Sequence, residues 1–118
     1  MNKRYKRIKR PDGTSFENTN RSHALIEKLD RRNPVFEYYK YRIAVYGEES
    51  MIFERWMQES FGPSKWYGLI KREIKAGCTV FDDTPWLLDR DFNGGWFTVT
   101  HLYFNRSCEP MIFLKFSE

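Results

Sequence analysis

The sequence contains little cysteine and histidine, and it lacks the spacings by which these residues hold metals. The four residues are His23, His101, Cys78 and Cys108, and no C-x-x-C or H-x-x-x-H pair places two of them together. No metal site is therefore predicted. The two cysteines bracket a presumed hairpin, but a disulfide would need an oxidising compartment and nothing suggests secretion, so two reduced thiols are the favoured interpretation.

Long apolar runs are also absent. No segment approaches the roughly 18 apolar residues of a membrane span, and the first residues lack the apolar core of a signal peptide. Aromatic residues make up 18% of the 118 residues and apolar types 41%, which excludes general disorder and predicts one dense core. We expect one domain inside a cell, or part of a larger assembly, with no membrane partner.

Sequence motifs of catalysis are missing as well. There is no G-x-S-x-G nucleophile and no P-loop, and Gly62-Pro63-Ser64-Lys65 is more typical of a turn between helices than of an anion site. Four carboxylates near the presumed hairpin leave a metal-dependent nuclease as an alternative: Asp82, Asp83, Asp89 and Asp91. Turn chemistry explains these aspartates completely, so we expect no enzyme, no catalytic residues and no cofactor.

Charge is distributed unevenly, although the net charge is only +4. Six of the 20 basic side chains lie in the first ten residues, which contain no acid: Lys3, Arg4, Lys6, Arg7, Lys9 and Arg10. The rest of the chain therefore has 14 basic against 16 acidic side chains. Residues 1–10 are interpreted as a basic strand or flexible arm on a mildly acidic body. Such an arm is expected to contact nucleic acid or an acidic protein surface.

The periodicity of the apolar residues predicts helices and strands along the whole chain. The expected elements are a turn at Pro11-Asp12-Gly13, helices at Ser22–Arg31, Glu49–Ser60 and Ser64–Ala76, a strand at 35–46, and hairpin strands at 86–88 and 96–104. Residues 111–116 fit either a last strand or a helix. Ser107-Cys108-Glu109-Pro110 before them favours the helix.

These elements predict an α+β fold that resembles a ferredoxin-like or RNA-recognition-motif-like sandwich, with a small mixed or antiparallel sheet backed by two to three helices. Residues 1–34 would form a basic arm or hairpin, a turn and a short helix, and residues 35–118 the α+β core. One side of the strand at 35–46 looks like core. The other side is polar and aromatic and is expected to meet solvent or a partner: Tyr38, Lys40, Arg42 and Tyr46.

Tryptophan offers another kind of contact. If several of Trp66, Trp86 and Trp96 were exposed, they would anchor a protein interface, although core packing is the usual role of this residue.

Three stretches of the chain resemble small accessory proteins of tailed bacteriophages, which are themselves uncharacterised. They are YRIAVY at 41–46, FERW at 53–56 with FGPS at 61–64, and LYF at 102–104 running into MIFLKF at 111–116. The resemblance covers the last two-thirds of the chain. It implies a viral origin, a place in the host cytoplasm or the virion, and no catalytic residues. We therefore expect a non-catalytic module that binds a host or viral protein or nucleic acid, with a structural component of the virion as the alternative.

Overall fold

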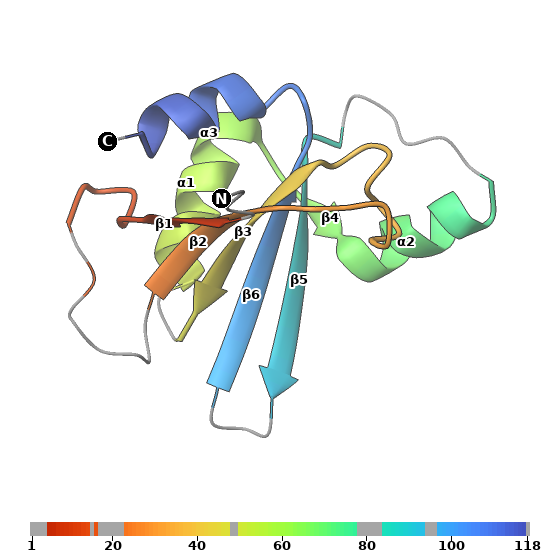
Figure 1. Cartoon of the computed structure of the whole chain (residues 1–118), viewed down its shortest axis with the longest axis horizontal. Helices are drawn as coiled ribbons and strands as arrows, with labels where there is room; N and C mark the ends of the chain where they lie inside the picture. Colours follow the sequence, from red (N-terminus) through yellow and green to blue (C-terminus); the bar gives the residue numbers. More distant parts are fainter. Residues whose placement is uncertain are drawn as a thin grey trace.

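A six-stranded sheet and three helices form the computed structural model, which describes residues 5–14, 16, 23–47, 50–77, 84–93 and 97–117 (Figure 1). For residues 5, 91–93, 97 and 98 it describes the backbone alone. The strands are β1 (Tyr5–Ile8), β2 (His23–Lys28), β3 (Tyr41–Tyr46), β4 (Lys65–Trp66), β5 (Trp86–Asn93) and β6 (Phe97–Phe104). The helices are α1 (Ser50–Phe61), α2 (Tyr67–Lys75) and α3 (Glu109–Lys115). The expected α+β class is confirmed.

The sheet has the strand order β1-β2-β3-β6-β5-β4, so β1 and β4 are its two edges. All neighbours are antiparallel except β4 and β5, which are parallel. The register places residues of adjacent strands in rows across the sheet. One row joins Glu27, Arg42 and Tyr103, and the next joins Leu25, Ala44 and His101. Because side chains alternate between faces along a strand, both of these rows lie on the same face.

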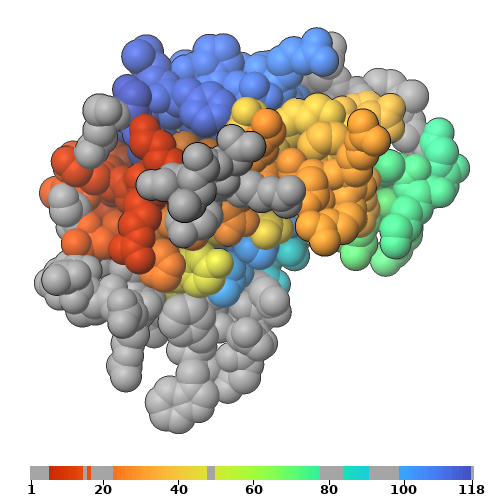
Figure 2. All heavy atoms as spheres, in the orientation of Figure 1, coloured from red at the N-terminus to blue at the C-terminus, as the bar shows by residue number. Residues whose placement is uncertain are grey.

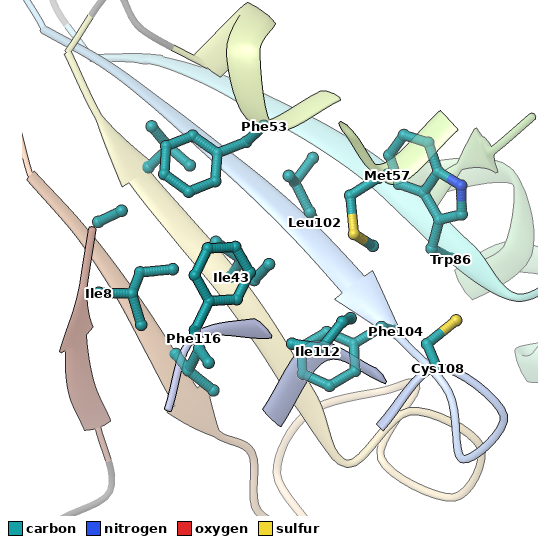
Figure 3. Close-up of a cluster of buried hydrophobic side chains, with 13 residues drawn as sticks. Ile8, Ile43, Phe53, Met57, Trp86, Leu102, Phe104, Cys108, Ile112 and Phe116 are labelled. Carbon is teal, nitrogen blue, oxygen red and sulfur yellow. The ribbon is translucent and has the colours of Figure 1, made fainter. Parts of the chain in front are cut away.

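One face of the sheet, here called the first face, packs against α1 and α3. Phe53 and Met57 from α1 and Ile112 and Phe116 from α3 meet the central strands (Figure 3). The strand residues of this core are Ile8, Ala24, Ile26, Ile43, Val45, Trp86, Leu102 and Phe104. Burial of this apolar surface is the main source of stability expected for the fold.

The opposite face, here called the second face, is covered at its β5 end by α2 and by the segment 29–40. Val35 and Tyr39 from that segment are fully buried, and they share a cluster with Ile70 of α2 and with Leu87 and Tyr103 of the sheet. Figure 2 shows the segment, in orange, beside the green surface of α2. The Tyr39 hydroxyl donates to the Thr84 carbonyl at 2.7 Å, which holds the segment in place.

Two predictions about the first third of the chain are wrong. The short helix expected at Ser22–Arg31 is strand β2, whose buried residues alternate because Ala24 and Ile26 face the core. The strand expected at 35–46 begins only at Tyr41, because Asn33 starts a turn in which its side chain accepts from the Val35 backbone at 3.1 Å. The turn continues with backbone bonds to the Asn33 and Val35 carbonyls.

Most predictions for the elements after residue 50 agree with the structure. The α1 helix, the β5–β6 hairpin and the terminal helix α3 are confirmed, and so is the turn at Pro11-Asp12-Gly13, where Gly13 has a φ of 90°. The helix predicted at Ser64–Ala76 starts later, at Tyr67, since Lys65 and Trp66 pair with β5 as strand β4. A ferredoxin-like arrangement is not confirmed, and the sheet has more strands than expected.

Candidate binding surfaces

The basic N-terminal segment is part of the sheet from Tyr5 onward. Strand β1 pairs with β2, and Ile8 is 7% exposed and belongs to the first-face core. Lys6, Arg7 and Lys9 are exposed, while Lys3 and Arg4 lie outside the described residues. Of the two predicted forms, a basic strand or a flexible arm, the described part of the segment is a strand, which lies at the edge of the sheet and presents cations. We call Lys6, Arg7 and Lys9 the basic edge.

Arg10 differs from these cations because it contributes to the turn that follows β1. Its guanidinium carbon lies 4.6 Å from the centroid of the Phe16 ring, and its Nη1 donates to the Thr14 hydroxyl at 3.4 Å. The Phe16 ring in turn stacks on Phe53 of α1. Arg10 thus attaches the turn to the first-face core.

Two of the four residues predicted on a polar strand face lie elsewhere. Tyr38 and Lys40 precede β3, and Tyr38 packs against the cluster under the segment 29–40. The Lys40 ammonium lies 3.9 Å from the centroid of the Phe36 ring. Tyr46 does lie on β3, where it stacks on His23 with ring centroids 4.5 Å apart. The structure therefore does not place the four side chains on one strand face.

Arg42, the remaining residue of that set, lies at the centre of a hydrogen-bonded network on the second face. Its Nε donates to Glu27 Oε2 at 2.7 Å, and its Nη1 donates to the Tyr103 hydroxyl at 2.9 Å. The Tyr67 ring stacks on Tyr103 with centroids 4.5 Å apart, and burial, followed by the neighbouring Tyr103, raises the pKa of Tyr67 to about 12. Because its guanidinium already has two protein partners, Arg42 has a structural role rather than a ligand-binding one.

Replacement of Arg42 by methionine tests this structural role. We expect the free energy of unfolding to fall by about 2 kcal/mol, because the half-buried Glu27 carboxylate loses a charged hydrogen bond. The double variant Arg42→Met/Glu27→Gln should recover part of this loss. Urea unfolding followed by circular dichroism measures both values. A single variant as stable as the parent would show that the network contributes little.

The two histidines lie on the second face in rows next to each other. His101 is half-buried, and its Nδ1 is 3.9 Å from Asp89 Oδ2, too far for a hydrogen bond. Burial, with a smaller effect from Arg42, lowers the pKa of His101 to about 4, so the ring is neutral at pH 7. Burial, followed by Arg7, also lowers the pKa of His23.

The residues of the nuclease alternative are only partly placed. Asp82, Asp83 and the Asp91 side chain lie outside what the structure describes, and Asp89 faces His101. Among the described side chains, no three of His, Cys, Asp or Glu are close enough to share a metal ion. Cys108 is buried, which raises its thiol pKa to about 11, and Cys78 also falls outside the described residues.

A second basic surface, which the sequence analysis missed, lies at the opposite edge of the sheet from β1. Residues 62–77 contain four basic side chains and one acidic one, and of the basic ones Lys65, Arg72 and Lys75 are exposed. Trp66 is 57% exposed and Leu69 is 48% exposed. We call these five residues the α2 surface. Counting charge over residues 62–77 separately would have found it, whereas the balance over the whole remainder of the chain concealed it.

The other tryptophans contribute less to the surface. Trp86 is 2% exposed, Trp56 packs against the first-face core, and Trp96 lies outside the described residues.

Apolar side chains are also exposed on the two helices of the first face. Met51 and Ile52 of α1 line a groove of about 320 Å³ together with Trp56 and the turn at Pro11 and Asp12. On α3, Met111 is 49% exposed and Leu114 is 78% exposed. Such side chains suit contact with another protein.

No protein-family model matches this chain, and neither a curated protein nor a solved structure matches it. Of the helices that the structure describes, none has the length and apolar character that crossing a bilayer requires.

Proposed function

We propose that the protein is a non-catalytic binding module that contacts the phosphate backbone of nucleic acid through the basic edge. The observation that carries this proposal is the exposure of Lys6 and Arg7 on an edge strand that the core holds rigidly through Ile8. Cations on a fixed strand lose less conformational freedom on binding than cations on a flexible tail. Attraction of this kind is largely independent of the nucleotide sequence, and it weakens as the salt concentration rises.

Lys6 and Arg7, the two cations of the basic edge that belong to strand β1, lie on different sides of the sheet. In the register of β1 with β2, Arg7 pairs with Leu25 of the second face, whereas Lys6 pairs with Ile26 of the first face. A nucleic-acid strand that runs along the edge can therefore meet both side chains. If the second face also bound RNA, as the open face of an RNA-recognition-motif sheet does, further contacts would lie beside Tyr46.

The test is neutralisation of the edge by Lys6→Gln/Arg7→Gln. Binding of a single-stranded oligonucleotide should weaken roughly tenfold at low salt, and the slope of log K against log salt should fall by about 1.4, which is about 0.7 for each lost phosphate contact. Fluorescence anisotropy over a salt series measures both. Deletion of residues 1–10 is a poorer test, because it would also remove strand β1 and Ile8 from the core.

The matched control is Arg31→Gln/Arg106→Gln, which removes the same charge from exposed positions outside the basic edge. Equal losses in the two double variants would mean that only net charge matters, which contradicts a defined contact at β1. Failure of the parent protein to bind any nucleic acid at low salt would reject the proposed function altogether.

A protein partner is the second candidate, and the exposed apolar residues of α1 and α3 favour it. It would fit the proposed viral origin, a place in the host cytoplasm or the virion, and a structural role in assembly. Pull-down from host or infected lysate with and without nuclease treatment separates the candidates: a partner protein whose capture survives the nuclease and is lost in Leu114→Asp supports this one. Mg²⁺-dependent cleavage that is lost in Asp83→Ala would instead support the nuclease alternative.

A further inference from the structure

We infer that the α2 surface is a second nucleic-acid contact, specific for single strands, in which an unpaired base stacks on Trp66. This inference rests on the proposed function and extends it from backbone attraction to recognition of unpaired bases. Trp66 is a large, exposed aromatic side chain on a surface with several cations, a combination that binds single-stranded nucleic acid in other proteins.

The backbone holds Trp66 in a defined place. The residue pairs with Leu88 as part of β4 and then serves as the N-cap of α2, with φ and ψ of −73° and 133°. On the inner side of the helix, Ile70 is 2% exposed and fixes α2 against the second face. The indole is therefore presented from a rigid edge, and within the described part of the chain no aromatic ring stacks on it.

Exposed cations lie on β4 and α2, the two elements that Trp66 joins. Lys65 and Trp66 are neighbours in the edge strand β4, with side chains that alternate between its two sides. Leu69 and Arg72 are three residues apart and share the outer face of α2. Lys75 continues the exposed basic side in the last turn. Leu69 adds an exposed apolar side chain to the same surface. This surface has one aromatic ring, one leucine and three cations. It is too highly charged for the core of a protein interface, which is depleted in charged residues, and it suits bases and phosphates better.

The sheet places the α2 surface and the basic edge at opposite ends. Six strands about 4.8 Å apart separate the two edges by roughly 24 Å. A long single strand can therefore reach both contacts, whereas a short one can occupy only one of them. Linking two weak contacts through one strand raises the overall affinity without any new interaction.

The experiment compares Trp66→Ala and Trp66→Phe on a single-stranded oligonucleotide of about 20 nucleotides and on the corresponding duplex. We expect Trp66→Ala to weaken single-strand binding roughly tenfold and duplex binding less than about twofold, with the salt slope unchanged. Trp66→Phe keeps a stacking ring and should lose less, about threefold. Titration of the parent protein should quench tryptophan fluorescence, and this quenching should be absent in Trp66→Ala.

Leu114→Ala is the control, because it removes an exposed apolar side chain on α3, outside the α2 surface. Unchanged single-strand affinity of Trp66→Ala, in a protein whose binding still depends on Lys6 and Arg7, would overturn this inference and leave the proposed function intact. Absence of all nucleic-acid binding would overturn both. Trp66-dependent binding of polyglutamate that equals the binding of the oligonucleotide would assign the surface to an acidic protein instead.

Discussion

Replacement of Trp86 by alanine is expected to lower the free energy of unfolding by about 3–5 kcal/mol. Trp86 is 2% exposed and lies beside Met57 in the first-face core (Figure 3). Its indole Nε1 donates to the Gly62 carbonyl at 2.8 Å, which joins β5 to the residue that follows α1. The alanine variant would leave both a cavity and an unpartnered carbonyl.

Gly62 makes this contact possible because of its backbone conformation. Its φ is 87°, in the left-handed region that glycine adopts easily, and its N–H donates to the Gln58 carbonyl at 2.9 Å. The chain therefore turns directly after α1, and the Gly62 carbonyl accepts the hydrogen bond from the Trp86 indole. A small domain with a total stability of about 5–15 kcal/mol would lose a large part of it in Trp86→Ala.

Urea unfolding followed by circular dichroism measures the change, with Trp86→Phe as the graded control. Phenylalanine keeps most of the apolar volume and loses the hydrogen bond, so we expect a loss of about 1–3 kcal/mol. If Trp86→Ala unfolds at the same urea concentration as the parent, the position of Trp86 in the core is wrong. If both variants lose equal stability, the hydrogen bond and not the volume is the larger contribution.

Acidification is expected to destabilise the protein through His101. The pKa of this residue in the folded chain is about 4, against an ordinary value of 6.5, because burial and Arg42 oppose its protonation. Between these two values the unfolded chain takes up a proton that the folded chain does not. The stabilising effect of neutral His101 is therefore complete above pH 6.5 and is lost as the pH falls towards 4.

The groups around the ring come from three strands. Arg42 lies on β3, Asp89 on β5 with its Oδ2 3.9 Å from His101 Nδ1, and Tyr103 on β6 with its ring centroid 6.0 Å from that of His101. Asp89 would favour a charged ring, but burial outweighs it. At about 1.36 kcal/mol for each pKa unit, the lowering corresponds to about 3 kcal/mol in total, of which about 2 kcal/mol is lost between pH 7.5 and pH 5.

The measurement compares urea unfolding of the parent protein and of His101→Gln at these two pH values. Carboxylates titrate in both proteins, so their contribution cancels in the difference, and the variant should lose about 2 kcal/mol less than the parent on acidification. An identical pH dependence of the two proteins would mean that His101 titrates with an ordinary pKa.

Local sequence patterns were sufficient for α1, α3 and the β5–β6 hairpin, but not for strand β4 or for the start of β3. Phe53 and Met57 recur at helical spacing before Gly62-Pro63, so α1 could be predicted from its own residues. The hairpin of β5 and β6 followed from its turn residues, and the basic character of the first strand followed from composition. These features depend on neighbours in sequence, which is why the sequence by itself determined them.

Only the tertiary structure decided the role of residues 23–40 and the character of the second face. Ala24, Ile26 and Leu29 fit a helix as well as a strand, and pairing with β1 and β3 selected the strand. Arg42 was predicted on an open face, but its partners Glu27 and Tyr103 come from 15 and 61 residues away in sequence. The sequence did not distinguish Trp66 from Trp86, but Trp66 is exposed and Trp86 is buried. The physical reason is the same in each case: partners distant in the chain satisfy or cover these side chains, and no local pattern contains that information.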